Sequence, residues 1–325
     1  MAGWSLGRFD GYTDSYSGDC SMSTVHTTIL TAGRSGNAFV GRFADYLEMT
    51  KPRIVVLELI VAGAAACLAM PYGLNVVVVL HALFGTALVA SSASLANSWW
   101  ERESDALMPR TANRPLPTGR VTCLEAFVLA ALMLAFGLSW LVYYVNLLTA
   151  SIGLASWLIY ALIYTPLKKR TPLNTVVGAV AGAAPILMGW TATGASLDLT
   201  AMALAGVLFL WQFPHFMAIA WLYRQDYAQA GHKMLSVVDP GGLRCGANAV
   251  VAALLLIPVS LIPAIMPTGG SPLIYFVWAL GIGVVQLALA IRFAIFRDEK
   301  SARLLLRTTL LYLPAWMAML LVVTF

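Results

Sequence analysis

Long apolar stretches separated by short polar connections recur along the chain from Ile54 to its end. Each stretch has about 17 to 24 residues, enough at 1.5 Å per residue to cross a hydrocarbon core about 30 Å thick. Glycine and proline interrupt several of them, which membrane helices tolerate because neighbouring helices satisfy the freed backbone groups. The pattern predicts an all-α, polytopic membrane protein whose nine transmembrane helices cover residues 54–70, 74–96, 122–142, 147–166, 173–192, 200–222, 247–265, 273–291 and 304–324.

The basic residues predict how this chain is oriented. All 20 lysines and arginines lie in or beside alternate connections, beginning with the segment before the first helix. The opposite connections, 71–73, 143–146, 193–199 and 266–272, are short and contain none. Because cytoplasmic loops carry the excess of Lys and Arg, we expect a cytoplasmic amino terminus and a carboxyl terminus on the opposite side. The longer, charged connections then place any polar site at the cytoplasmic face.

Composition excludes several classes of protein. Hydrophobic residues make up 60% of the chain and charged residues only 11%, against about a quarter charged in soluble domains. The net charge of +5 serves membrane topology, and nucleic acid is not an expected partner, because no basic surface is clustered. Four cysteines without a C-x-x-C pair indicate neither a disulfide framework nor a zinc site.

Residues 1–37 differ from the rest. They are rich in Ser, Gly and Thr and have no apolar stretch that could form a signal-peptide core. Asp10, Asp14 and Asp19 argue against a mitochondrial transit peptide, which is normally poor in acids. We expect a flexible N-terminal extension, followed by one membrane domain over residues 38–325.

The segment "NSWWERESDALMPRTANRPLPTGR", residues 97–120, concentrates polar chemistry at the end of the second helix. Asn97, Glu101 and Asp105 follow at intervals of four, so they share one helix face. Carboxylate and amide oxygens are the ligands that Mg²⁺ prefers while it binds substrate phosphates. Arg110 and Arg114 follow, and arginine matches phosphate oxygens, so the segment predicts a diphosphate site. The alternative is a solvated loop of mixed charge at the membrane surface.

Two further clusters lie on the same side. "YTPLKKRTPLN", residues 164–174, contains Lys168 and Arg170, which either set topology alone or also bind phosphate. "WLYRQDYAQAGHKML", residues 221–235, contains Asp226, a candidate for a further carboxylate that bridges metal.

Ionisable residues inside the predicted helices form a second set of candidates. His215 follows Pro214 within the sixth helix. Ionisable groups at membrane depth usually face the bundle interior and belong to functional sites. The alternative is a neutral imidazole that binds a carbonyl group freed by the proline. Glu58 and His81, in the first two helices, raise the same question with weaker context.

Long motifs in the same order resemble the intramembrane prenyltransferases that include enzymes of quinone biosynthesis, and most closely the branch that farnesylates protoheme IX. They are "DYLEMTKPR" at 45–53, the acidic segment at 97–120, "YTPLKKRTPLNTVVGAVAGAAPILMGW" and "FLWQFPHFMAIAWLYRQDYAQAGHKMLSVVDP". The resemblance implies a bundle around a central cavity open to the cytoplasm and to lipid. It also implies that Mg²⁺ binds farnesyl diphosphate, that a protoheme vinyl group attacks the farnesyl group, and that water completes heme O.

The resemblance assigns roles residue by residue. Asn97, Glu101 and Asp105 match the metal motif, with Asp226 as the acid of the third cluster. The cations expected to bind the diphosphate are Arg110, Arg114, Lys168 and Arg170. His215 matches a histidine that would contact heme. Glu101 stands where many relatives have Asp, which preserves the charge. Gln225 stands where close relatives often have Glu, and the loss of this acid weakens the argument for a second metal.

Two further expectations follow from the resemblance. The chain would work in the lipid bilayer of a bacterial inner membrane, and its product would serve a terminal oxidase or pass to heme A synthase. The alternatives are a sister prenyltransferase with an aromatic or chlorin-like acceptor, and a transporter. A transporter fits less well, because transporters place substrate groups at the bilayer midplane, often between inverted repeats.

Overall fold

The computed structural model describes residues 38–70, 73, 75–265 and 271–325. The predicted extension, residues 1–37, lies outside these described residues. Every regular element within them is helical, and nine helices are long and apolar enough to cross a membrane. The prediction of an all-α protein with nine spans is therefore confirmed.

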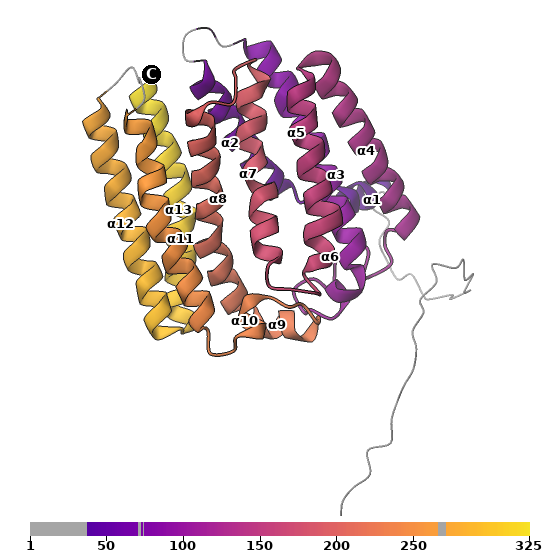
Figure 1. Ribbon diagram of the computed structural model, residues 1–325. Coiled ribbons are helices and arrows are strands. Elements are labelled where there is room, and N and C mark those ends of the chain that lie inside the picture. Colours follow the sequence, from indigo (N-terminus) through magenta and orange to yellow (C-terminus); the bar gives the residue numbers. More distant parts are fainter. Residues whose placement is uncertain (1–37, 71–72, 74, 266–270) are drawn as a thin grey trace, which may run out of the picture. The chain divides into compact units, whose positions relative to one another are not determined.

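The helices run side by side as one bundle, with short helices at one end (Figure 1). In chain order the elements are α1 (Ala38–Met49), α2 (Pro52–Ala69), α3 (Val76–Ala106), α4 (Cys123–Tyr144), α5 (Leu147–Leu158), the π-helix η1 (Ile159–Tyr164), α6 (Thr165–Leu167), α7 (Asn174–Ala192), α8 (Leu199–Leu222), α9 (Arg224–Gln229), α10 (Leu235–Val238), α11 (Leu243–Leu261), the 3₁₀ turn η2 (Ile262–Ile265), α12 (Pro272–Phe296) and α13 (Glu299–Thr324).

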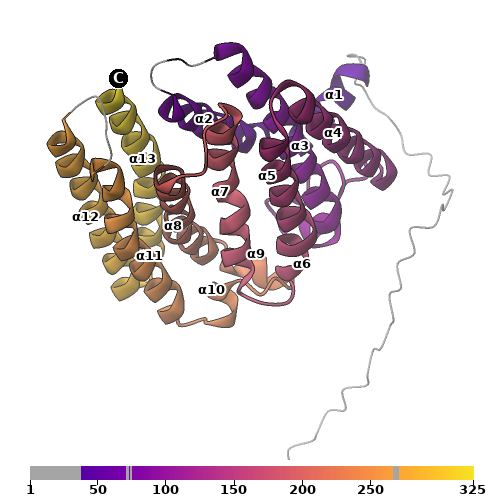
Figure 2. The same cartoon turned by 45° about the horizontal axis from the view of Figure 1, so that its top comes forward.

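Helix α7 lies in the interior of the bundle, between α2 and α8 (Figure 2). It is rich in Gly and Ala, which lets neighbouring backbones approach closely in a membrane. At Gly189 the approach is closest, since a Cβ atom there would lie 1.9 Å from the carbonyl oxygen of Ala62 on α2. Small residues thus fix the spacing of α2 and α7.

Polar side chains cap several spans. The Asn75 side chain accepts hydrogen bonds from two backbone N–H groups at the start of α3. Thr122 and Glu125 form a capping box at the start of α4, each side chain accepting from the other residue's backbone N–H. Glu125 also forms an ion pair with Arg42 of α1. One carboxylate therefore both caps α4 and holds α1 against the bundle.

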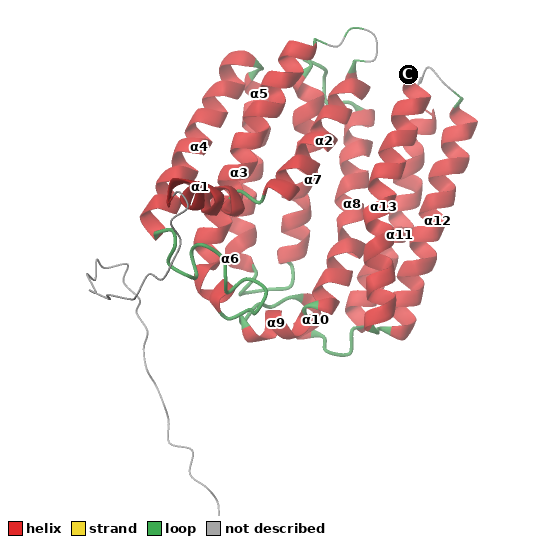
Figure 3. Ribbon diagram, turned by 180° about the vertical axis from the view of Figure 1, so that it is seen from behind, coloured by secondary structure: helices red, strands yellow, loops and turns green. Residues whose placement is uncertain are grey.

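Helix α1 lies across the bundle instead of crossing it in parallel with the spans (Figure 3). Besides Arg42, it is held by Asp45 and Glu48, which both pair with Arg120 in the connection between α3 and α4. These contacts attach α1 to the start of α4 and to the connection before it. The short helices α6, α9 and α10 lie at one end of the bundle. We call this end, the lower one in Figure 1, the polar end.

Span boundaries differ from the prediction mainly at this end. The second span was expected over 74–96, but α3 continues as one helix to Ala106. No glycine or proline occurs between Asn97 and Ala106, and the helix ends shortly before Pro109, where a proline ring would clash with the preceding turn. This extension presents the predicted metal motif on a rigid helix.

Candidate active site

Three side chains of α3 form the base of the candidate site. Asn97, Glu101 and Asp105 lie on one face of the helix, as the spacing predicted, and their exposed fractions are 1%, 7% and 1%. Buried carboxylates are costly unless they are paired or bind metal. Their burial therefore argues against the alternative of a solvated loop.

Each of these three side chains meets a cation from another segment. The Lys51 amine donates to Asn97 Oδ1 at 2.6 Å, Lys168 Nζ lies 2.6 Å from Glu101 Oε1, and Arg114 donates to Asp105 Oδ2 at 2.7 Å. The cations come from the turn before α2, the end of α6 and the connection after α3. Tertiary structure thus pairs one amide and two carboxylates of α3 with three cations from other segments.

Burial and charge shift the pKa values of the two lysines in opposite directions. Burial lowers the pKa of Lys51 to about 8, because its nearest partner, Asn97, is uncharged. Burial also disfavours the charged form of Lys168, but the Glu101 carboxylate outweighs this effect and raises the Lys168 pKa well above its usual value. Lys168 is therefore a fixed positive charge in the site.

Around these pairs lies a polar cavity of about 110 Å³. It is lined by Lys51, Asn97, Glu101, Asp105, Met108, Arg110, Arg114, Tyr160, Lys168, Tyr227 and His232. The lining residues come from α3, η1, α9, the turn before α2 and the connections after α3, α6 and α9, so no single motif contains the site. The space suits a small, highly charged group.

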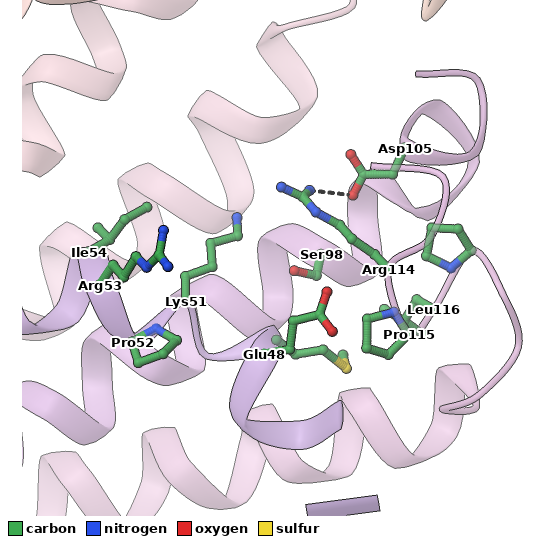
Figure 4. Close-up of a pocket in the computed structure, with 12 residues that line it drawn as sticks. Glu48, Lys51, Pro52, Arg53, Ile54, Ser98, Asp105, Arg114, Pro115 and Leu116 are labelled. Carbon is green, nitrogen blue, oxygen red and sulfur yellow. Dashed lines mark hydrogen bonds and ion pairs between the residues drawn. The ribbon is translucent and has the colours of Figure 1, made fainter. Parts of the chain in front are cut away.

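A larger outer pocket of about 480 Å³ adjoins the polar cavity and shares three of its lining residues, Lys51, Asp105 and Arg114 (Figure 4). Figure 4 shows Arg114 reaching Asp105 while Lys51 extends toward the same region. Its other walls are largely apolar and are formed by Met49, Pro52, Ile54, Pro115, Leu116 and Pro117, together with Glu48, Arg53 and Ser98. A polar group in the cavity and an apolar group in the pocket could therefore lie side by side.

Lys51 occupies a special backbone conformation. Its φ of 53° is left-handed, although it is not a glycine and precedes a proline. Such conformations cost of order 1–3 kcal/mol and persist where surrounding structure enforces them, often at functional sites. Here the turn between α1 and α2 directs the lysine amine to Asn97.

The connection after α3 also docks on α9. Arg110 Nε lies 3.8 Å from Asp226 Oδ2, and the Arg110 guanidinium lies over the rings of Tyr223 and Tyr227, 4.8 and 5.3 Å from their centroids. It also donates to the Tyr227 hydroxyl at 3.2 Å. The structure therefore brings Arg110 and Asp226 together, as partners of one another.

Five residues that line the polar cavity were not predicted from the sequence: Lys51, Met108, Tyr160, Tyr227 and His232. Lys51 lies in the quoted "DYLEMTKPR" motif, where the lysine followed by proline was the available signal. Tyr160 belongs to η1, and π-helical turns are frequent at functional sites. His232 is 2% exposed, and burial lowers its pKa, so its neutral imidazole faces the cavity.

Like Asp226, two further predicted site residues line neither pocket. Arg170 is exposed and belongs to the lining of neither pocket. His215 is half-buried on α8, where its Nδ1 lies 2.9 Å from the Thr309 hydroxyl of α13 and its ring stacks on Trp211. It too is absent from both pocket linings.

The predicted metal ligands provide oxygen atoms, as Mg²⁺ requires. Within the described residues, no three His, Cys, Asp or Glu side chains form a metal-binding group; the predicted set has two carboxylates and one amide. In the same part of the chain, Asp105 Oδ1 is buried and has no hydrogen-bond partner. A buried carboxylate oxygen without a partner, beside a second carboxylate and an amide oxygen, fits a hard cation that also binds phosphate.

Within the part of the chain that the structure describes, nine helices able to cross a membrane, with a charged cavity at one end, define an integral membrane protein with a polar site. The model of the UbiA prenyltransferase family matches residues 59–321, and the chain belongs to this family. The expected resemblance to intramembrane prenyltransferases is therefore confirmed.

Several relatives that cover most of this chain share a name. The protein called protoheme IX farnesyltransferase from Solibacter usitatus is 41% identical over 279 residues, which cover 83% of this chain and 95% of that protein. Its namesake from Rhodopirellula baltica is 41% identical over 83% of this chain and 96% of the relative. The mitochondrial protoheme IX farnesyltransferase of Arabidopsis thaliana is 36% identical over 84% of this chain and 63% of its own length.

Solved structures share the fold at low identity. A digeranylgeranylglyceryl phosphate synthase superimposes with a TM-score of 0.71 at 15% identity and covers 87% of this chain and 99% of its own. A UbiA homolog from Archaeoglobus fulgidus, bound to DMAPP and Mg²⁺, has a TM-score of 0.68 at 16% identity. The match covers 86% of this chain and 99% of the homolog.

Proposed function

We propose that this chain transfers the farnesyl group of farnesyl diphosphate to a vinyl group of protoheme IX and so makes heme O. The shared name of relatives that are 41% identical over more than four-fifths of the chain supports this substrate pair. Membership of a prenyltransferase family supports the reaction type.

The observation that carries the proposal is the row of three α3 side chains, each paired with a cation from a different segment. Departure of diphosphate builds negative charge on the leaving oxygen, and preorganised cations stabilise such charge most effectively where water is excluded. Lys51, Arg110, Arg114 and Lys168 all line the polar cavity and would bind the diphosphate. Arg170 would act only from outside it.

We propose Asn97, Glu101 and Asp105 as the residues that would hold Mg²⁺, with Asp226 near the same site. When bound, the ion would neutralise charge on the diphosphate. The chain's own contribution is to hold these oxygens on one rigid helix face and to keep Lys168 and Arg114 beside them. A solved relative of the same fold binds DMAPP and Mg²⁺, which supports this assignment.

The apolar wall of the outer pocket is proposed to receive the first isoprene units, since it shares Lys51, Asp105 and Arg114 with the polar cavity. Heme is proposed to contact His215. Because Thr309 engages Nδ1, only Nε2 of His215 can face the heme.

The topology proposal follows the distribution of lysine and arginine. The polar end would face the cytoplasm of a bacterium, with the amino terminus on that side of the inner membrane and the carboxyl terminus opposite. Heme O would then pass to a terminal oxidase or to heme A synthase.

The proposal is tested with the full-length protein in lipid vesicles, supplied with Mg²⁺, farnesyl diphosphate and either protoheme IX or hydroxybenzoate. We expect farnesylated heme, detected by mass spectrometry, only with protoheme. Farnesylated product from hydroxybenzoate alone would overturn the proposal that protoheme IX is the acceptor. The Asp105→Asn variant should lower the rate by a factor of about 100 or more, whereas Glu103→Gln, at a carboxylate whose side chain is 73% exposed, should not change it.

A further inference from the structure

His232 is a buried side chain of the polar cavity that belongs neither to the proposed metal ligands nor to the proposed cations. It is 2% exposed, and within the part of the chain that the structure describes its Nδ1 atom is buried without a hydrogen-bond partner. A buried polar atom without a partner has lost its hydrogen bonds to water and gained none in exchange. In the wall of a cavity, such an atom indicates that its partner is a ligand of that cavity.

The end of α9 fixes the position of His232. Gly231, at a φ of 70°, has the left-handed conformation in which many helices end. Its N–H donates to the Ala228 carbonyl at 3.1 Å, and the N–H of His232 donates to the Tyr227 carbonyl at 2.9 Å. These two bonds form a Schellman motif, in which the residue after the glycine packs against the helix. Here the imidazole lies edge-on to the Tyr227 ring, with 6.0 Å between the ring centroids.

The residue after His232 is anchored to the segment that carries Lys168. The N–H of Lys233 donates to the Lys168 carbonyl at 2.7 Å. The Asn174 side chain, at the start of α7, donates to the Lys233 carbonyl at 3.4 Å. His232 is thus held between two backbone anchors, so little ordering would be needed for its ring to bind a ligand.

The arrangement of the cavity favours a phosphate oxygen over a metal ion as the partner of His232. Within the described residues, no three His, Cys, Asp or Glu side chains form a metal-binding group, so His232 does not complete one with Glu101 and Asp105. Burial lowers the pKa of His232, so its ring is neutral and carries one N–H. With its proton on Nδ1, a neutral imidazole donates a hydrogen bond to an oxygen that can only accept, such as a phosphate oxygen.

The two pockets place His232 on the side of the terminal phosphate. Lys51, Asp105 and Arg114 line both pockets, so they lie at the junction between them. With the first isoprene units in the outer pocket, the phosphate bonded to the isoprenoid lies at this junction, and the terminal phosphate lies in the polar cavity. His232 lines the polar cavity alone.

We propose that His232 is a specificity-determining residue whose Nδ1–H donates a hydrogen bond to the terminal phosphate of the prenyl diphosphate, and so selects a diphosphate over a monophosphate. This inference rests on the proposed function for the prenyl diphosphate, but not for the acceptor. Lys51 and Arg114 at the junction meet the first phosphate, which both compounds have. A donor that only the second phosphate can engage distinguishes the two compounds, because the monophosphate leaves it unpaired.

The test measures binding and needs no acceptor. Full-length protein in detergent micelles with Mg²⁺ is titrated in a calorimeter with farnesyl diphosphate and with farnesyl monophosphate, and the ratio of the two Kd values gives the selectivity. For His232→Leu we expect a Kd for farnesyl diphosphate about tenfold higher, because a hydrogen bond to a charged group is lost. The Kd for farnesyl monophosphate should not change.

Two further variants complete the comparison. His232→Asn keeps a nitrogen donor near the place of Nδ1 and should retain most of the selectivity. Lys233→Gln is the matched control, since Lys233 is exposed and lines neither pocket. It should bind both compounds as the unsubstituted protein does.

Three results would overturn the inference. They are an unaltered selectivity in His232→Leu, an equal loss of affinity for both compounds in that variant, and a selectivity of His232→Asn as low as that of His232→Leu. If His232→Leu fails to fold, as judged by its melting temperature in detergent, His232→Ala decides by the same criteria. An unsubstituted protein that binds farnesyl diphosphate but makes no farnesylated heme would overturn the proposed acceptor, while the selectivity of the variants would still decide the role of His232.

Discussion

Lys168 Nζ lies 2.6 Å from Glu101 Oε1, with both side chains largely shielded from solvent. Breaking a buried ion pair by removing one partner leaves an uncompensated charge and costs about 3–5 kcal/mol. We therefore expect Glu101→Gln and Lys168→Met each to lower the free energy of unfolding by this amount, and the double variant to cost less than the sum.

Chemical unfolding in detergent micelles measures this coupling. The exposed pair formed by Arg303 and Glu299 is the control, since such surface pairs contribute about 0–1 kcal/mol. Additive losses for Glu101 and Lys168 would show that the two groups do not act as a pair.

Lys51 joins the polar cavity to the outer pocket, so its amine should matter for chemistry. Lys51→Met removes one cation from the proposed diphosphate site and should lower kcat about 100-fold. Arg53→Met is the control, because Arg53 is exposed and lines the outer pocket alone. Initial rates with saturating farnesyl diphosphate measure kcat for both variants. Equal losses of kcat in the two variants would contradict a specific role of the Lys51 amine.

The contact of Gly189 with Ala62 predicts a stability effect unrelated to chemistry. A Cβ atom at Gly189 would meet a backbone oxygen at 1.9 Å, so Gly189→Ala must separate α2 from α7 and should cost about 1–3 kcal/mol. At Gly281 on α12 nothing lies within 4 Å of the added atom. Gly281→Ala should therefore leave the melting temperature in detergent unchanged or raise it slightly.

Arg110 connects the segment after α3 to α9 through two tyrosine rings and Asp226. Arg110→Lys keeps the charge but loses the planar group that stacks on the rings. We expect a KM for farnesyl diphosphate about tenfold higher, the equivalent of one cation–π contact of about 1 kcal/mol or somewhat more. Tyr227→Phe keeps the ring and loses only the hydroxyl, so its effect should be smaller; the reverse order would contradict stacking as the cause.

The nine spans could be predicted because apolar length alone determines which segments cross a membrane. The same criterion missed the last ten residues of α3, which are polar and yet helical. The shared face of Asn97, Glu101 and Asp105 was predictable from helical periodicity. Arg114 and Lys168 were also predicted as cations of the site. The pairing of each cation with one ligand was not predicted, nor was the role of Lys51, since these partners lie 9 to 67 residues away and meet through tertiary packing.

Lys168 and Arg170 illustrate the limit of motif reasoning. They are two residues apart, so their side chains leave a helical turn in nearly opposite directions. One enters the polar cavity, and the other is exposed. Spacing within a cluster of cations thus predicts that one of them faces the site, but only the neighbouring helices determine which.

The double use of Glu125 has a consequence for how the outer pocket is built. The same carboxylate that caps α4 also fastens Arg42, and the helix fastened in this way ends with Glu48 and Met49, which form part of the pocket wall. A change at Glu125 would thus loosen the wall of a substrate compartment from a distance, without touching any residue that lines it. Substrate specificity would then change through the Arg42–Glu125 ion pair, before any residue that contacts substrate is altered.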